Sequence, residues 1–359
     1  MPNETQNPVE SVKAHYNILP GTGAKVGLLK RLSRDATLEV GPSGVFARAA
    51  GTRLRLASPE GAAPERLPRR YSCDLLEEAF AIPGPIEVGE NGLEVSGVTY
   101  KPLALPDGPT LKTHLTRPAD FKVLARVPGA QLALALESAA GFTRDPDTDK
   151  REYRPVVIEI SNQGVVLAAL NGPRMAWFKL GGPKYSGEPW CLSLGLTEPL
   201  KAISKVVAGW AEVELGFEVS SLEPVVLACG EERVTLLKNL ESFPDWERML
   251  KVATPGRFDL EALLRAAKRL RKAGAEELTL EGGRVSAETG SLEYSYTGPQ
   301  FKARVDAGRF IRALLSLAEV PETAEIGVGV NPYGQRSRVL AIHRGAAGAM
   351  LSAGALEEA

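Results

Sequence analysis

Apolar and polar residues alternate with a period of two along many short stretches of the chain, such as 36–49, 211–219 and 277–287. Turn signals that contain Gly or Asn interrupt such alternating stretches at 90–92, 162–164 and 281–283, so the pattern predicts β-strands joined in hairpins. Apolar residues instead recur every three to four positions in six segments, which we predict to be helices: 23–34, 73–80, 130–140, 199–208, 260–272 and 307–318. Short helices interleaved with strands predict an α+β fold, with helices packed on antiparallel sheets.

The same order of elements occurs three times along the chain. Each copy contains a helix, a set of strands, a second helix and a second set of strands. Proline and polar residues cluster at 105–120 and 243–256, between the copies. We therefore predict three domains of similar topology, with boundaries 1–112, 113–243 and 244–359.

The composition argues against a metalloenzyme, a disulfide-rich protein and a membrane protein. The chain has 359 residues, a net charge of −1 and only three histidines. Its three cysteines, Cys73, Cys191 and Cys229, fit neither a metal site nor a disulfide framework, which favours a reducing cytoplasm. No apolar run is long enough to span a bilayer. We predict no metal, no cofactor, no catalytic residues and no membrane.

One helix separates its charge from its apolar residues most clearly. In 260–272 the apolar stripe is formed by Leu260, Leu263, Leu264, Ala267 and Leu270. A second stripe is basic and is formed by Arg265, Lys268, Arg269 and Lys272. Like charges on one helix face repel each other, and a polyanion lying against that face would remove the penalty.

Three further helices carry basic residues away from their apolar side. These residues are Lys30, Arg31 and Arg34 in the first helix, Lys201 and Lys205 in 199–208, and Arg309 and Arg312 in 307–318. In 307–318 we expect Phe310, Ile311, Leu314 and Leu315 to be buried. The other two helices differ, since 130–140 carries only Glu137 and 73–80 carries Asp74, Glu77 and Glu78. These basic faces are either ordinary solvated surfaces or a surface for phosphates, which bind independently of sequence.

Two enzymatic alternatives find little support in the sequence. The stretch PGTGAKVG at 20–27 has the glycines and the lysine of a phosphate loop, but their spacing is wrong and Val26 follows Lys25 where Ser or Thr should hold magnesium. No spacing singles out a pair among the 44 acidic residues as the carboxylates of a hydrolase.

Three segments resemble the bacterial β sliding clamp family. FPDWERML at 243–250 is similar to the family's signature between its second and third domains, F-P-D-Y-x-R-V-[LI]. The runs 155–177 and 294–317 resemble second-domain and third-domain sequences of the family, in the same order and with similar spacing. The resemblance covers roughly residues 120–345, and the first 110 residues agree only in their order of elements.

This resemblance implies a non-enzymatic protein that encircles double-stranded DNA and binds it independently of sequence. Two chains would close head to tail into a homodimeric ring, with sheets outside and helices lining the hole. The ring would tether DNA polymerase and bind the clamp loader through a short peptide motif. Clamps of this family also touch DNA from a loop that corresponds to Lys150 and Arg151 here.

The resemblance also implies a pocket for partner peptides between the second and third domains. By register its residues are Leu170, Gly172, Pro173, Arg174, Met175, Pro244, Arg248 and Met249, and Met350 stands in for part of the family's apolar C-terminus. Pro173 replaces a family histidine, and the acidic end of the chain does not match the family's M-P-M-R-L. A second hypothesis is therefore a clamp-fold paralogue that acts as a monomeric interaction module and forms no ring.

Overall fold

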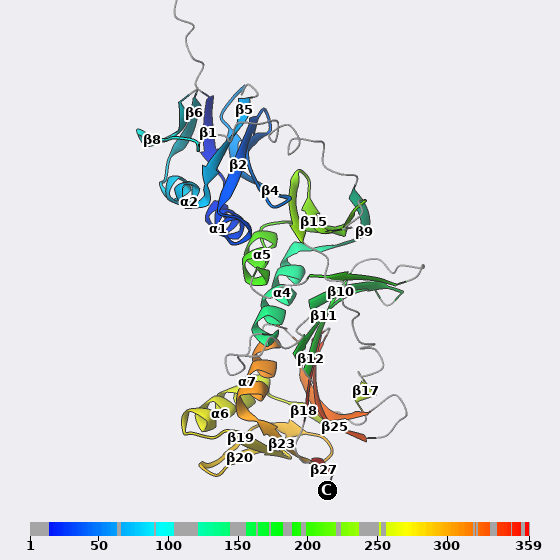
Figure 1. Cartoon of the computed structure of the whole chain (residues 1–359). Helices are drawn as coiled ribbons and strands as arrows, with labels where there is room; N and C mark the ends of the chain where they lie inside the picture. The colour runs from blue at the N-terminus through cyan, green and yellow to red at the C-terminus, as the bar shows by residue number, and fades with distance from the viewer. Residues whose placement is uncertain are drawn as a thin grey trace, which may run out of the picture. The chain divides into compact units, whose positions relative to one another are not determined.

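The structure is a computed structural model in which two compact units are described (Figure 1). Unit 1 comprises Met1–Phe121 and Val226–Thr235, and unit 2 comprises Lys122–Val225 and Leu236–Ala359. The three-domain boundaries stay a prediction. The described residues are 14–62, 66–89, 91–103, 121–143, 156–162, 164–171, 174–181, 189–194, 199–219, 224–236, 251–252, 256–318, 320, 322–330, 336–345, 347–352 and 356–358.

One strand, one helix and three further strands form a pattern that occurs six times. The first two copies are β1 (Ala14–Ile18), α1 (Thr22–Leu32), β2 (Asp35–Gly41), β3 (Gly44–Ala49), β4 (Thr52–Pro59), and β5 (Arg66–Ser72), α2 (Cys73–Ala81), β6 (Pro85–Gly89), β7 (Gly92–Val95), β8 (Val98–Tyr100). The next two are β9 (Phe121–Pro128), α4 (Gly129–Thr143), β10 (Val156–Ser161), β11 (Gly164–Asn171), β12 (Arg174–Gly181), and β13 (Trp190–Ser193), α5 (Leu200–Val207), β14 (Glu212–Glu218), β15 (Val225–Cys229), β16 (Glu232–Leu236).

The last two copies lie in unit 2. They are β18 (Gly256–Phe258), α6 (Leu260–Lys272), β19 (Glu277–Glu281), β20 (Arg284–Ala287), β21 (Gly290–Glu293), and β23 (Phe301–Asp306), α7 (Ala307–Ser316), β24 (Ala324–Val330), β25 (Arg336–Arg344), β26 (Ala347–Ser352). Among the described residues, three short strands stand outside the pattern: β17 (Lys251–Val252), β22 (Tyr296–Thr297) and β27 (Leu356–Glu358).

Consecutive copies exchange their first strands. β1 pairs with β6 and β5 pairs with β2, and the same exchange joins β9 to β14, β13 to β10, β18 to β24 and β23 to β19. Each copy therefore opens on a strand, whereas the sequence pattern predicted that each opens on a helix. That expectation was wrong because several of these strands, such as β5 and β9, contain basic residues and a proline, and their apolar residues do not recur with a regular period of two.

Two further pairings connect strands that are distant in the sequence. In unit 2, β12 and β26 are antiparallel partners from Met175↔Met350 to Phe178↔Ala347, so β13-β10-β11-β12-β26-β25-β24-β18 is one continuous sheet. In unit 1, β4 pairs with β16 at Arg53↔Arg233. Among the strands that the structure describes, β8 and β21 each have a neighbour on one side only.

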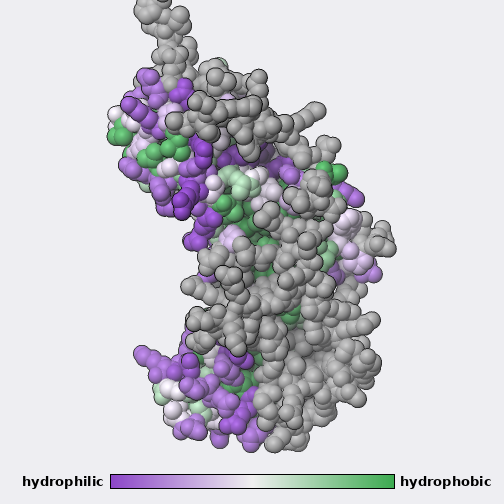
Figure 2. Space-filling view, viewed as in Figure 1, coloured by the Kyte–Doolittle hydropathy of each residue, from purple (hydrophilic) through white to green (hydrophobic). Residues whose placement is uncertain are grey.

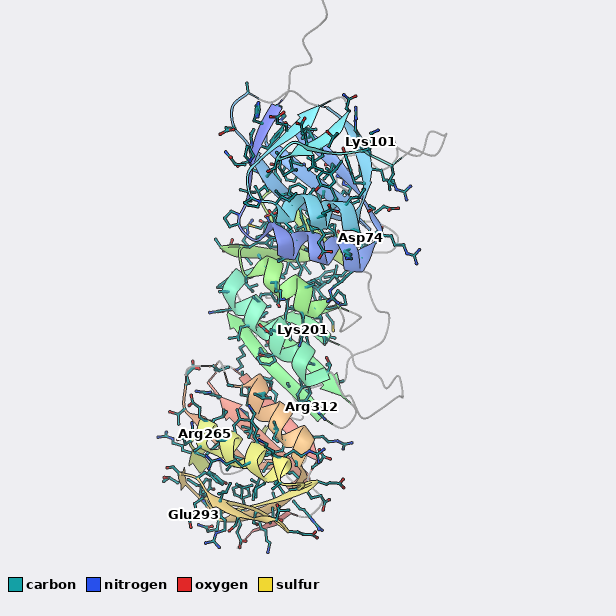
Figure 3. The ribbon with its side chains drawn as sticks, turned by 90° about the vertical axis from the view of Figure 1, so that its left-hand side faces the viewer. Asp74, Lys101, Lys201, Arg265, Glu293 and Arg312 are labelled. Carbon is teal, nitrogen blue, oxygen red and sulfur yellow. The ribbon has the colours of Figure 1, made fainter. Side chains whose placement is uncertain are left out.

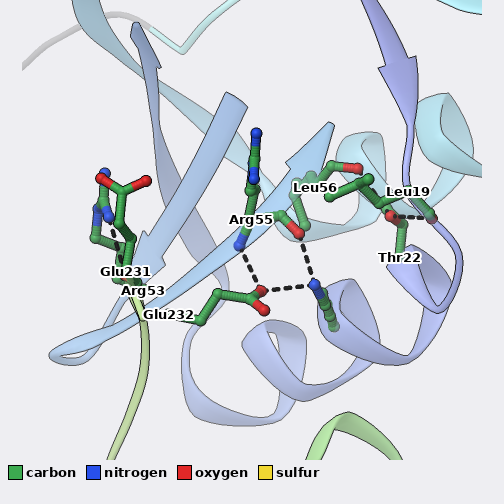
Figure 4. Close-up of polar contacts among 8 residues, drawn as sticks. Leu19, Thr22, Arg53, Arg55, Leu56, Glu231 and Glu232 are labelled. Carbon is green, nitrogen blue, oxygen red and sulfur yellow. Dashed lines mark hydrogen bonds and ion pairs between the residues drawn. The ribbon is translucent and has the colours of Figure 1, made fainter. Parts of the chain in front are cut away.

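A buried ion pair in unit 1 supports the β4–β16 pairing (Figure 4). The Nζ atom of Lys25 donates to Glu232 Oε1 at 2.6 Å and to the carbonyl oxygen of Arg55 at 2.8 Å. Glu232 Oε1 also accepts a hydrogen bond from the backbone N–H of Arg55 at 2.8 Å. Lys25 thus serves to hold a carboxylate in place, which agrees with the rejection of a phosphate loop at 20–27.

The helices formed where the apolar spacing predicted them. The bounds of α6 are those predicted, and the other five differ by a few residues. Asp259 and Asp306 cap α6 and α7 by accepting hydrogen bonds from the backbone N–H groups of Ala262 and Arg309, which satisfies donors that a helix leaves unpaired at its start. All five residues of the predicted apolar stripe of α6 are buried.

Candidate functional site

Four helices of unit 2 form a row in the order α5, α4, α7, α6. Helix α4 packs against both α5 and α7, and α7 also packs against α6. Figure 1 shows the four helices along one side of the unit, with β10, β11, β12 and β25 on the other side. In Figure 3 the row faces the viewer, and Lys201 on α5, Arg312 on α7 and Arg265 on α6 all belong to it. The predicted basic residues of three helices are therefore brought onto one side of unit 2.

The basic stripe of α6 is exposed along its whole length. Arg265, Lys268, Arg269 and Lys272 are all exposed, while the opposite face is buried. Arg265 lies 3.6 Å from Glu261, which is one turn earlier in the first turn of the helix. Arg271 is exposed too and was missed by the sequence reasoning; its Nη1 donates to the carbonyl oxygen of Ala275. Figure 2 shows the surface over α6 and β20 as mainly hydrophilic.

The buried face of helix α7 differs from the one that its sequence predicted. Phe310 and Leu314 are buried as expected, but Ile311 is half-buried and Leu315 is 44% exposed, so the predicted burial of Leu315 was wrong. The buried stripe runs through Phe310, Ala313, Leu314 and Leu317 and is narrower than predicted. Arg309 is exposed, whereas Arg312 is half-buried.

The remaining two helices of the row differ in charge. Lys201 and Lys205 of α5 are exposed, and Leu200, Ile203, Val206 and Val207 are buried beneath them as predicted. Helix α4 has no basic residue, and its one charged side chain, Glu137, is exposed. The positive charge of the row is thus concentrated on α5, α7 and α6.

Unit 1 neutralises part of its own basic helix. Lys30 of α1 is exposed, but its Nζ lies 2.7 Å from Asp74 and 2.6 Å from Glu77, both on α2. The hydrogen bonds to Asp74 and then to Glu77 raise the pKa of Lys30, since both carboxylates favour the ammonium form. Arg31 and Arg34 are exposed. The sequence showed the acidic residues of α2, but their contact with Lys30 depends on the packing of α1 against α2.

Three of the predicted pocket residues occupy neighbouring positions in one sheet. Leu170 of β11 pairs with Met175 of β12, and Met175 pairs with Met350 of β26. Leu170 and Met175 are buried, with exposed fractions of 6% and 3%. Arg174 pairs with Asn171 at the same end of β11 and β12. The other predicted pocket residues, Gly172, Pro173, Pro244, Arg248 and Met249, lie outside the described residues, as do Lys150 and Arg151.

Metal sites and membrane spans are both absent from the described residues. No group of three or more His, Cys, Asp or Glu side chains is placed to hold a metal ion there. None of the described helices combines the length and the apolar character needed to cross a membrane. Cys73 is buried, and burial raises the pKa of its thiol to about 11, so it is not activated as a nucleophile.

Solved structures of DNA polymerase sliding clamps resemble the whole chain. The sliding clamp of Pseudomonas aeruginosa matches with a TM-score of 0.70 and 14% identity, over 95% of this chain and 99% of that one. The beta subunit of the Streptococcus pyogenes DNA polymerase matches over the same shares, with a TM-score of 0.65 and 16% identity. The chain has the bacterial sliding-clamp fold. It is a divergent example, because no protein-family model and no curated protein matches its sequence.

The β clamp of Helicobacter pylori, solved with a DNA ligase peptide, matches with a TM-score of 0.65 and 14% identity, again over 95% of this chain and 99% of that one. The resemblance found at 243–250 and in the two longer runs is thereby confirmed at the level of the fold.

Proposed function

We propose that two copies of this chain close head to tail into a ring that encircles duplex DNA and tethers a polymerase to it in the cytoplasm. The observation that carries the proposal is the side of unit 2 on which α5, α7 and α6 present Lys201, Lys205, Arg309 and the α6 stripe. A row of cations without a base-reading element attracts phosphates independently of sequence. Such contacts are weak and interchangeable, so the protein could slide along DNA.

Ring closure needs two free sheet edges per chain. Strands β8 and β21 are the candidates, because they are the last strands of their copies of the pattern and each has one described neighbour, whereas the last strands of the other four copies pair with one another, β4 with β16 and β12 with β26. A head-to-tail contact joins two different surfaces and closes only if its rotation fits. In this proposal β8 of one chain pairs with β21 of its partner, and the three predicted domains of each chain, 1–112, 113–243 and 244–359, form half of the ring.

The partner site of the proposal lies around Leu170, Met175 and the Met350 position. Unbranched, polarizable Met side chains suit a surface that accepts several partners. The proposed occupants are short peptides of DNA polymerase and of the clamp loader, and the remaining pocket residues are those that the sequence predicted. A DNA ligase peptide occupies the Helicobacter pylori clamp, which supports a peptide as the kind of ligand.

The ring is tested by two measurements, the mass of the protein in solution and its retention on circular and linear DNA. Light scattering at micromolar concentration should give the mass of two chains. The protein, loaded on nicked circular DNA, should be retained at moderate salt and should be lost when the circle is linearised with free ends. Equal retention on circular and linear DNA would overturn the ring, because a groove binder does not depend on DNA ends.

The monomeric interaction module is the second candidate. The pairing of Lys30 with Asp74 and Glu77 favours it, since unit 1 then offers less positive charge to DNA than the sequence suggested. A chain that scatters light as a monomer and still binds a polymerase-derived peptide would support this candidate over the ring.

A further inference from the structure

The third sheet carries a strand that the repeated pattern does not explain. In the six-fold pattern β5, β13 and β23 are equivalent, since each is the first strand of a copy and pairs with the preceding copy's sheet. Among the described strands, β5 and β13 end their sheets, whereas β23 has a second neighbour, β27, in the order β21-β20-β19-β23-β27. Strand β27 therefore occupies an edge at which β5 and β13 have no neighbour among the described strands.

The register of β27 matches the side-chain alternation of β23. Phe301, Ala303 and Val305 of β23 are buried, and Lys302, Arg304 and Asp306 are exposed. The antiparallel register sets Leu356 opposite the buried Ala303 and Glu357 opposite the exposed Lys302. Directly opposed residues of an antiparallel pair share a face of the sheet. Leu356 and Glu357 are thus in phase with a buried and a basic position of β23, whereas Glu358, the last residue of β27, stands opposite the buried Phe301.

The exposed face of β23 favours an acidic strand. Arg304 already forms an ion pair with Glu277 of β19 at 2.8 Å, and Lys302 is opposite Glu281 of β19 on one side and Glu357 of β27 on the other. Opposite charges facing each other across strands stabilise a pairing, and like charges weaken it. The backbone N–H and C=O groups along the outer edge of β23 supply affinity for any extended chain.

We propose that the outer edge of β23 is a strand-addition site for extended segments that set an apolar residue opposite Ala303 and an acidic residue opposite Lys302, and that Leu356–Glu358 occupies it within the same chain. The site is separate from the peptide pocket around Met175 and does not depend on the ring. A partner segment of the same chemistry competes with residues 356–358, whose tether gives them a high effective concentration. A partner segment therefore binds only if its affinity for β23 is high enough to displace the chain's own tethered segment.

The test removes the internal competitor and offers it back as a free peptide. In a chain ending at Ser352, those amides of 301–305 that point toward β27 should exchange hydrogen faster than in the full chain, and those that point toward β19 should change little. A labelled peptide with the sequence of residues 353–359, AGALEEA, should bind the shortened chain at least ten-fold more tightly than the full chain and should restore protection to 301–305. The charge-reversed peptide AGALKKA should bind more weakly than AGALEEA.

Two variants of the full chain keep the test decisive if the shortened chain is unstable. Glu357→Lys should speed exchange at 301–305 in an otherwise intact protein, whereas Glu357→Asp, which keeps the charge opposite Lys302, should leave exchange slow. Unchanged exchange at 301–305 on shortening and in Glu357→Lys would overturn the proposal. Equal binding of AGALEEA and AGALKKA to the shortened chain would overturn its acidic preference.

Discussion

The indole ring of Trp177 meets the imidazole ring of His343 edge to face, with ring centroids 5.0 Å apart and an interplanar angle of 71°. Gly348 lies between them, since it pairs with Trp177 across β12–β26 and with His343 across β25–β26. A Cβ atom on Gly348 would lie 2.0 Å from the Trp177 ring. The glycine therefore lets the indole lie across β26, at the seam that joins the two halves of the unit 2 sheet.

Gly348→Ala should destabilise unit 2 by about 1–3 kcal/mol, because the added methyl group collides with the Trp177 ring in a packed core. Urea unfolding followed by far-ultraviolet circular dichroism would measure the change. The matched control is Gly89→Ala in β6, where an added Cβ has no atom within 4 Å. If both variants lose the same stability, the collision with Trp177 is not the cause.

Acidification should weaken the same seam through His343. Burial lowers the pKa of this imidazole below its usual value of 6.5, so the unfolded chain takes up the proton more readily than the folded one. The contribution of His343 to stability is complete above pH 6.5 and is lost as the pH falls from there through the lower pKa of the folded state. Between pH 7.5 and 5.5, His343→Gln should lose less thermal stability than the unaltered protein. The half-exposed His15 provides the control variant, His15→Gln, and a parallel decline in all three proteins would contradict the prediction.

Local pattern accounts for the helices but for less of the sheets. Helix α6 has the predicted bounds because its apolar stripe, its Asp259 cap and its basic end all agree. The first strands β5, β9 and β23 were missed because each carries several charged residues, which makes its sequence resemble a polar connection between helices and strands. Such a strand can be identified only from the strand with which it pairs, and β23 pairs with β19.

The sequence also predicts only some of the contacts in the candidate site. The stripe on α6 could be predicted because its members are three and four residues apart. The partners of Lys30 could not, since Asp74 and Glu77 lie on a different helix. Lys25 and Glu232 are 207 residues apart, and no spacing rule connects residues at that distance.

Breaking the Lys25–Glu232 pair should be costly for unit 1. Lys25→Met removes the ammonium that faces the Glu232 carboxylate, whose side chain is 15% exposed. Loss of one partner of a buried pair costs about 3–5 kcal/mol, and the small remaining exposure sets the expectation at the lower end. Chemical unfolding would measure it, with the exposed neighbour substitution Glu231→Gln as control. The double variant Lys25→Met, Glu232→Leu should regain part of the loss, and a fully additive loss would show that the two residues act independently.

Reversing the α6 stripe should weaken DNA retention without unfolding the protein. In Arg265→Glu, Lys268→Glu, Arg269→Glu the altered side chains are exposed and the buried face of α6 is untouched. Each phosphate that the protein no longer neutralises should lower the dependence of binding on salt, by roughly 0.9 in the slope of log K against log salt. The matched control reverses three exposed arginines of the unit 2 strands, Arg257, Arg284 and Arg304. Equal losses in both triple variants would mean that net charge, and not the helix row, governs retention.

The acidic residues of α2 should oppose DNA binding by holding Lys30. Glu77→Gln removes one of the two carboxylates that contact the Lys30 ammonium, while Glu78→Gln removes an equal charge from the same helix at a residue that instead hydrogen-bonds Tyr100. If α1 faces DNA, retention on circular DNA should lengthen about two- to five-fold in Glu77→Gln, because a released cation can exchange its carboxylate for a phosphate. Glu78→Gln should gain less, since it changes only the long-range field, which salt screens. A gain of the same size in both variants would assign the effect to net charge, and no gain in either would place Lys30 away from the DNA path.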